Sequence, residues 1–411
     1  MTWFLESIAR QPDEVELVLI QRGRNVMNLE GTIASRARNI KVVQMSDDRY
    51  WDFHRDYFCK RWGGCNERDR RRIDRHLRNV GRYDPQSYSL SILRGQVFKS
   101  FIHPGVEWWG WCDFDTVIGS LKRKFPWDII ADDYDVILPV HRNTDPQRLM
   151  FMRGHLTFFR NTQRSADKIT GHPDFKTKEG WLNMRDFHYK EACRKHKTLG
   201  CSPKEASYSS YIVNNPSVNF LAFDALAKKH YLAVTSHGTY ALSNGLSDKR
   251  RAILVAERLL SDKQSDHQPS FLPPPPTFSD MGQVRDITLI QGNYSAGSVW
   301  FHPKYSTHYV PVYGNGEKSF KIDNYLTYIY RLNGRTEERL EPVSKVEKRP
   351  DVIEEWLYLH WQEEKKKDWF LEIPRQFLGS EDWILLTQGH EKGGFWKLAV
   401  DDDANSIFIE Q

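Results

Sequence analysis

The chain has 411 residues, of which 39% are hydrophobic, so it is long enough to bury one large core or two ordinary ones. Its 59 lysines and arginines exceed its 54 aspartates and glutamates by only 5, a weaker basic excess than a nucleic-acid-binding protein usually carries. No apolar run approaches the roughly 20 residues that cross a bilayer, and no secretory signal opens the sequence. We therefore expect no nucleic-acid partner and no membrane span.

The first 200 residues alternate between helical and strand-like patterns. Residues 3–10 show helical spacing and end before Pro12, whereas residues 15–20 and 40–45 are typical of strands. The remaining predicted segments in this part are helices at 48–79, 88–102, 115–125 and 181–195, and strands at 108–112, 134–140 and 153–160. This alternation predicts an α/β protein.

Six arginines crowd residues 68–78, which is the densest basic stretch of the chain. Glu67, Asp69 and Asp74 interrupt it, so we interpret it as a solvated helix with internal ion pairs rather than as a binding surface.

The second half is less regular. Four consecutive prolines at 273–276 indicate a surface loop or linker. We divide the chain into an N-terminal domain at 1–260, a proline-rich loop or linker at 261–284, and a C-terminal part at 285–411 that forms a small β-rich extension. Short aromatic segments predict the strands of that extension at 369–373, 383–386, 395–400 and 407–409.

The five cysteines are too few and too irregularly spaced for a disulfide scaffold or a zinc cluster. Cys59 with Cys65, or Cys193 with Cys201, would each close a small loop in an oxidising compartment, and Cys112 would then stay free. Free buried cysteines are the equally plausible alternative.

The most informative segment is an aromatic strand at 108–112 that stops at two carboxylates, Asp113 and Asp115. Ligands of open α/β sheets bind outside the carboxyl ends of strands, so this pair suits a metal site. Ordinary helix-capping acids are the alternative. The same Asp-x-Asp pattern recurs at Asp133 and Asp135 and within 401–403, where we interpret the acids as solvated turn carboxylates.

Three ordered motifs carry a family resemblance. Trp-Gly-Trp-Cys-Asp-Phe-Asp at 109–115, Tyr-Asp-Val-Ile at 134–137 and Gly-His-Leu-Thr-Phe-Phe-Arg-Asn at 154–161 resemble the core of a family of GT-A glycosyltransferases. The resemblance is tightest over 88–162. It implies a GT-A-like, Rossmann-like mixed central sheet flanked by helices, followed by the small β-rich C-terminal part. It also implies that 1–260 is the nucleotide-sugar-binding and catalytic domain and that 285–411 completes the active site.

The resemblance also implies a reaction. A nucleotide-sugar donor, with a UDP-sugar expected, loses its sugar to a glycan or glycoconjugate acceptor, and Mn²⁺ or Mg²⁺ neutralises the departing diphosphate. Asp115 is the expected direct metal ligand and Asp113 the expected contact to ribose or metal-bound water, or the reverse. His360, after the strand-like run 355–359, is the expected third ligand, with His390 as a weaker substitute; a backbone-bonded histidine is the alternative.

The same resemblance assigns further site residues. Expected donor-binding residues besides the acid pair are Gln21, Arg94 and Trp111, and expected acceptor-binding residues are His155, Arg160 and Asn161. Glu205 is the candidate catalytic base, and Asp186 and Glu179 are further options.

Two departures from the family leave other functions open. The family has a strand before its first helix and an acid where this chain has Gln21, so we expect a shortened N-terminus or a sheet that opens differently. An inactive transferase-like binding protein is the first alternative function, and a metal-dependent phosphoesterase is the second. By resemblance the expected location is the Golgi or secretory lumen of a eukaryote, with the usual anchor absent, or otherwise the cytoplasm.

Overall fold

A computed structural model gives the conformation of about half of the chain. The residues that it describes are 2–23, 29, 35–83, 88–125, 127, 130, 133–141, 156–182, 208, 211–212, 215–226, 231–235, 238–242, 247, 250–257, 285–286, 289–290, 304–305, 325–332, 335–342, 353–361, 383–388, 392–400 and 407–410.

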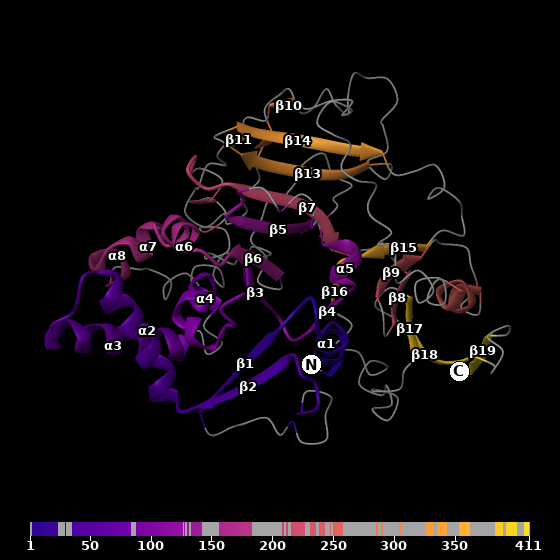
Figure 1. Ribbon diagram of the computed structural model, residues 1–411, viewed down its shortest axis with the longest axis horizontal. Coiled ribbons are helices and arrows are strands. Elements are labelled where there is room, and N and C mark those ends of the chain that lie inside the picture. The colour runs from indigo at the N-terminus through magenta and orange to yellow at the C-terminus, as the bar shows by residue number, and fades with distance from the viewer. Residues whose placement is uncertain are drawn as a thin grey trace, which may run out of the picture.

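The centre of the molecule is a mixed sheet of nine strands, counted over the described residues. Its main path runs in the order β10 (Arg285–Asp286), β14 (Arg335–Pro342), β13 (Tyr325–Leu332), β7 (Phe220–Leu226), β5 (Val136–His141), β6 (Leu156–Arg160) and β3 (Trp108–Cys112) (Figure 1). Off this path, β16 (Tyr358–His360) pairs with both β7 and β4 (Thr116–Ile118). Because β5 is parallel to β7 but antiparallel to β6, the sheet is mixed, and the predicted α/β class is confirmed.

Three further sheets surround this one. A six-stranded sheet in the described part has the order β15 (Ile353–Trp356), β9 (Thr239–Leu242), β8 (Tyr231–Thr235), β17 (Trp383–Gln388), β18 (Lys392–Val400) and β19 (Ile407–Glu410). The other two are the parallel pair β1 (Leu17–Arg22) and β2 (Ile40–Met45), and the antiparallel pair β11 (Leu289–Ile290) and β12 (Lys304–Tyr305).

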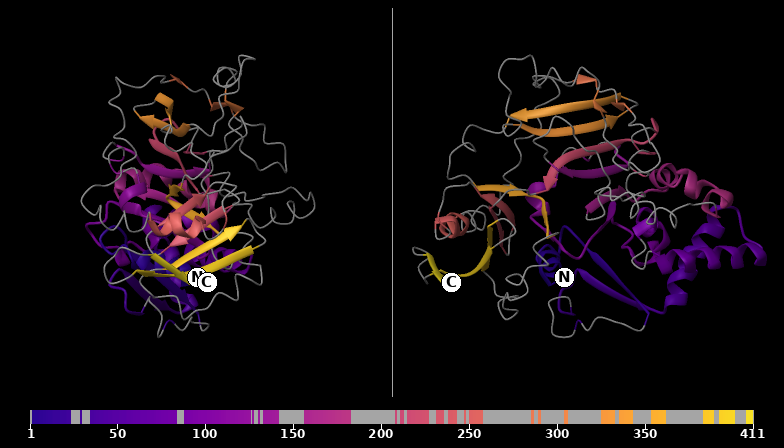
Figure 2. Two further views of the ribbon diagram at one scale, coloured as in Figure 1. Left: turned by 90° about the vertical axis from the view of Figure 1, so that its right-hand side faces the viewer. Right: turned by 180° about the vertical axis from the view of Figure 1, so that it is seen from behind.

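The helices are short except for two. Their bounds are α1 (Thr2–Ala9), α2 (Asp47–Arg61), α3 (Glu67–Tyr83), α4 (Arg94–Val97), α5 (Leu121–Lys124), α6 (Gln163–Ile169), α7 (Pro173–Lys176) and α8 (Lys178–Leu182), with 3₁₀ helices η2 (Tyr88–Leu93) and η3 (Lys99–Phe101). Helices α2, α3 and α6 to α8 gather at one end, and the six-stranded sheet lies at the other, with the central sheet between them (Figures 1 and 2). Within the described residues, no helix is long and apolar enough to cross a bilayer.

Local sequence explains the longest elements. Ser46 caps α2 by accepting a hydrogen bond from the Arg49 backbone, and acidic and basic side chains occupy its first and last turns, where the helix dipole favours them. No residue larger than glycine fits at position 110 of β3, because a Cβ atom there would lie 2.3 Å from the backbone oxygen of Thr157 on β6. This close approach lets the indole rings of Trp109 and Trp111 stack on Phe159.

Two predicted helices are wrong. Residues 116–118 form strand β4, because they pair with β16, and only the short helix α5 follows, capped by Ser120 rather than by Asp115 or Thr116. Residues 88–102 are mostly 3₁₀, with a single turn of α-helix at 94–97. Apolar spacing alone does not separate these alternatives in short segments, and pairing with a distant strand decides the first of them.

The disulfide alternative is resolved for one pair. Cys59 and Cys65 form a disulfide across the turn between α2 and α3, where Gly63 and Gly64 adopt positive φ. Cys112 is free. Cys193 and Cys201 lie outside the described residues, as do the proline-rich loop and residues 369–373.

Candidate metal site at the end of β3

The acid pair lies in a tight turn between two strands. Strand β3 ends at Cys112 and β4 begins at Thr116, whose backbone N–H donates to the carbonyl of Asp113 over 3.2 Å. Between the two acids, Phe114 is 45% exposed. Its ring and that of the buried Phe4 of α1 are arranged edge to face, with their centroids 5.8 Å apart. The turn therefore brings both carboxylates to the carboxyl end of a central-sheet strand.

Strand β16 brings the predicted histidine to the same turn. Its antiparallel register on β4 sets His360 opposite Thr116, and the backbone N–H of Trp361 donates to the carbonyl of Asp115 over 2.7 Å. The His360 Nε2 atom then lies 3.2 Å from Asp115 Oδ1, with the two side chains 13% and 18% exposed. Register, rather than proximity in sequence, makes this contact.

The three side chains form a cluster with metal-ligand spacing. One donor atom each from Asp113, Asp115 and His360 lies within 4.8 Å of the others. Ligands about 2.1 Å from a divalent ion lie about 3 Å apart when adjacent and about 4 Å apart when opposite. All three side chains are partly exposed, which leaves directions open for other ligands. The cluster can therefore hold an ion without a large backbone movement.

Helix α1 supports β4 from one side. The backbone N–H of Ile118 donates to Ser7 Oγ over 3.1 Å, and that of Leu121 donates to Gln11 Oε1 over 2.6 Å. Ser7 thus satisfies a backbone donor of β4, and Gln11, just beyond the end of α1, satisfies the first backbone donor of α5.

Close packing fixes the other end of β4. The Gly119 N–H donates to the carbonyl of Leu357 over 2.7 Å, and a Cβ atom at Gly119 would lie 2.5 Å from the carbonyl oxygen of Trp356. Only glycine allows this approach of the chain to the segment before β16.

A buried ion pair links the segments on either side of the cluster. Arg123 of α5 donates from Nη2 to Glu355 Oε1 over 2.6 Å, and from Nε to both oxygens over 3.0 and 3.1 Å. The side chains of Arg123 and Glu355 are 16% and 3% exposed. Since α5 follows β4 and Glu355 precedes β16, the pair ties the two cluster-bearing strands together. Sequence reasoning missed it, because nothing local connects the two residues.

The electrostatic surroundings are mixed in sign. The pKa of the Cys112 thiol is raised, mainly because the sulfur is buried and next because the Asp113 carboxylate is negatively charged. Asp115 raises this pKa by a smaller amount, whereas Arg94 lowers it. Cys112 is therefore a neutral thiol at physiological pH, and not a nucleophile. Arg94 is the basic residue whose charge acts on the thiol of Cys112, which is next to the acid pair in the sequence.

Several predicted residues do not join the cluster. Trp111 is buried in the main core against Phe159, and Gln21 is buried on β1 opposite Gln44. Arg160 stacks over Trp108 at 5.2 Å and donates to the carbonyl of Ile130.

Arg160 and Asn161 lie at the start of β3, the end opposite to the acid pair. The antiparallel register of β6 sets Arg160 beside Trp108, and Asn161 donates to the carbonyl of Val106 over 2.8 Å. Asp113 is beyond the opposite end of this strand, five residues from Trp108, which corresponds to about 17 Å at 3.4 Å per residue. The structure therefore does not bring these two predicted acceptor residues to the acid pair.

The remaining candidates are not placed. His155, Glu205, Asp186 and His390 lie outside the described residues. Glu179 is exposed on α8.

Of the other two acidic motifs, Asp133-Tyr-Asp135 departs from its predicted role. Asp133 is exposed, as predicted for a turn carboxylate, but Asp135 is fully buried. It accepts hydrogen bonds from Ser165 Oγ, Lys168 Nζ and the Asn219 backbone over 2.6, 2.6 and 2.8 Å. The solvated-turn interpretation of Asp135 is wrong, because its partners come from distant parts of the chain. Residues 401–403 lie outside the described part.

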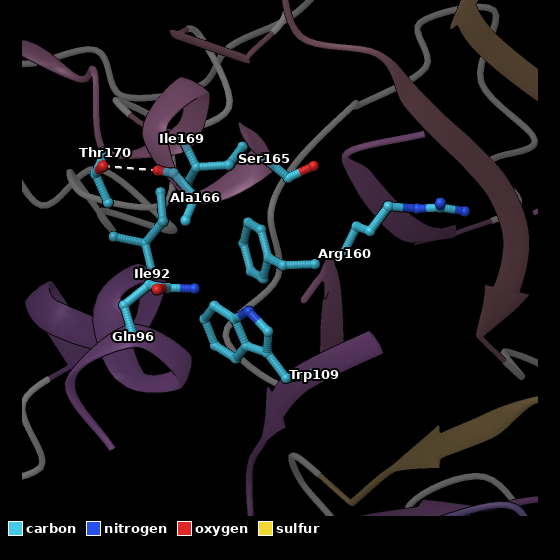
Figure 3. Close-up of a pocket in the computed structure, with 9 residues that line it drawn as sticks. Ile92, Gln96, Trp109, Arg160, Ser165, Ala166, Ile169 and Thr170 are labelled. Carbon is cyan, nitrogen blue, oxygen red and sulfur yellow. Dashed lines mark hydrogen bonds between the residues drawn. The ribbon is translucent and has the colours of Figure 1, made fainter. Parts of the chain in front are cut away.

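A small cavity lies elsewhere, near the start of β3 (Figure 3). Its lining includes Trp109 and Phe159 with residues of α6, and its water-accessible space of about 10 Å³ is that of a single water molecule. The Arg160 side chain points away from the other lining residues in Figure 3. The cavity is far too small for a nucleotide sugar.

Comparison with known proteins adds one match. Residues 88–199 match the model of a family of unknown function, DUF6625. The match includes Asp113 and Asp115 but not His360. No curated protein and no solved structure matches the chain.

Proposed function

We propose that the protein is a metal-dependent glycosyltransferase that moves a sugar from a nucleotide-sugar donor, expected to be a UDP-sugar, to a glycan or glycoconjugate. The observation that carries the proposal is the convergence of Asp113, Asp115 and His360, which come from opposite halves of the chain. A histidine that merely completes a strand would not need two carboxylates at ligand spacing.

The donor set favours Mn²⁺ over Mg²⁺. Carboxylate oxygens suit both ions, but an imidazole nitrogen suits Mn²⁺ better than the strictly oxygen-preferring Mg²⁺. When bound, the ion would neutralise the charge that develops on the departing diphosphate. In this assignment, Asp115 and His360 hold the ion from one side, and Asp113 binds it directly or through water.

Arg94 supports the same reaction by its charge. Its charge lowers the pKa of the thiol of Cys112, the last residue of β3. A permanent cation there would attract a phosphate group and partly offset the repulsion between the two carboxylates. Arg94 is therefore our candidate for a phosphate contact.

The arrangement of the sheet is compatible with a GT-A-like donor site. The acid pair follows the carboxyl end of a strand in a mixed α/β sheet, which is where such sheets place their ligands. The Cys59–Cys65 disulfide favours an oxidising compartment, so we also propose a secretory-lumen location.

The test combines donor binding with turnover. Thermal shift of the purified chain is measured with UDP-, GDP- and CMP-sugars, each with and without Mn²⁺, and donor hydrolysis is followed without acceptor. We expect stabilisation by one nucleotide class only when Mn²⁺ is present, and metal-dependent hydrolysis of that donor. Asp115→Asn and His360→Gln should abolish both effects, whereas the matched control Asp133→Asn, in the exposed second Asp-x-Asp motif, should keep them.

Other outcomes separate the alternatives. Metal-dependent donor binding without turnover, with or without acceptor glycans, would identify an inactive binding protein. Hydrolysis of simple phosphoesters without any response to nucleotide sugars would identify a phosphoesterase. No response to any donor or metal would contradict the proposal altogether.

A further inference from the structure

Helix α3 presents a row of arginines on its outer face. Ile73 and Leu77 are fully buried and define the inner face, while Arg68, Arg72 and Arg75 are exposed. At 100° per residue these three lie within about 60° of one another, opposite the buried side, and they extend about 10 Å along the axis. They form a narrow straight row, which we call the arginine row.

The acids of the helix pair mainly with cations outside this row, and Arg72 has only a weaker Coulombic interaction with Asp69. Asp69 pairs with Lys178 at 2.8 Å, Asp74 pairs with Arg55 of α2 at 3.3 Å, and Glu67 pairs with Arg71 at 3.2 Å. Because two of the three acids turn toward neighbouring elements, the predicted internal ion pairing holds only for Glu67 with Arg71. Among the described residues, the arginine row has no carboxylate within salt-bridge distance.

The position of α3 leaves this face accessible within the described part of the chain. The helix lies at the end of the molecule where α2 and α8 also gather (Figure 1), and both pack on its other sides. The turn that joins α2 to α3 is closed by the Cys59–Cys65 disulfide. The row is thus carried by a braced helix rather than by a loop.

We propose that the arginine row binds a linear polyanionic glycan, such as a sulfated or uronate-containing chain. Guanidinium groups bind sulfate and carboxylate in two-pronged geometry, and a straight row fits acidic groups repeated along an extended chain. Between residues 68 and 75, this face carries no apolar side chain to enter a bilayer and no aromatic ring on which a nucleic-acid base would stack. Binding here requires neither Mn²⁺ nor a nucleotide.

The test measures fluorescence anisotropy of a labelled heparin-derived hexasaccharide with the full-length protein, without metal. The altered protein carries three substitutions, Arg68→Gln, Arg72→Gln and Arg75→Gln. The matched control removes the same charge from arginines that have carboxylate partners, by Arg70→Gln, Arg71→Gln and Arg78→Gln.

We expect the row variant to bind at least about tenfold more weakly than the wild type, since each exposed ion pair contributes up to about 1 kcal/mol. The control should stay within about threefold, and wild-type affinity should fall as salt rises. Equal losses in both variants would show a general charge effect and overturn the proposal. Absence of wild-type binding, or a preference for phosphatidylserine vesicles or single-stranded DNA, would also overturn it. Because metal and donor are absent, these results do not depend on the transferase assignment.

Discussion

Breaking the ion pair between Arg123 and Glu355 should destabilise the fold in an asymmetric way. The pair is nearly buried, and Arg123 makes three hydrogen bonds to the carboxylate. Removing one partner of such a pair leaves a buried charge and typically costs about 3–5 kcal/mol. Glu355 is the more deeply buried partner. Arg123→Met should therefore lower the free energy of unfolding more than Glu355→Gln does.

A double-mutant cycle measures this pair directly. Urea unfolding is followed for the wild type, the two single variants and the combined Arg123→Met/Glu355→Gln protein. We expect the double variant to lose less than the sum of the single losses, with a coupling of about 2 kcal/mol or more. Both single variants should also bind Mn²⁺ more weakly while still folded, because the pair connects the segment that follows β4 to the segment that precedes β16, and these strands position Asp115 and His360. Single losses below about 1 kcal/mol, with additive effects, would refute the reasoning.

Three other expectations concern stability. Burial lowers the pKa of His54 from 6.5 to about 4. As pH falls, the unfolded chain therefore binds a proton at this histidine before the folded chain does. The free energy of unfolding should consequently decrease by about 3 kcal/mol between pH 6.5 and pH 4. Urea midpoints across this range should fall more steeply for the wild type than for His54→Leu, and parallel curves would contradict the assignment. Asp135→Ala should cost about 3–5 kcal/mol in urea unfolding, since it leaves Lys168 without its buried partner; a loss below about 1 kcal/mol would show that the network is dispensable. Reducing the Cys59–Cys65 disulfide should remove about 2 kcal/mol, as expected for so short a loop, and a Cys59→Ser/Cys65→Ser variant should show no response to reductant in a thermal melt.

Sequence patterns predicted the elements whose signals are local. The strands at 40–45 and 108–112 and the helices in 48–79 follow from apolar spacing, capping and charge, and the structure confirms them. Residues 116–118 were misassigned as helix because their pairing partner is near position 360, and no local window contains both. Short apolar runs fit a strand and a helix equally well until tertiary contacts decide.

In the candidate site, too, residues with local sequence signals can be predicted, whereas residues defined by distant contacts cannot. Asp113 and Asp115 can be found in the sequence because a strand stops at them. The family resemblance indicates His360, and the register of β16 places this histidine beside Asp115. Asp135 looked like a turn acid, since the groups that bury it, including Lys168 and Asn219, come from other elements. Residues that act through distant partners are the ones that single-sequence reasoning misses.

Direct Mn²⁺ binding tests the central claim most simply. The free Mn²⁺ signal in electron paramagnetic resonance is titrated with the wild type, Asp113→Asn, Asp115→Asn, His360→Gln and the control Asp133→Asn, without any nucleotide. The account predicts one site in the wild type and the control, and a loss of affinity of at least about tenfold in each of the other three, since each removes one ligand. Full-strength binding in all three variants, or none in the folded wild type, would contradict it.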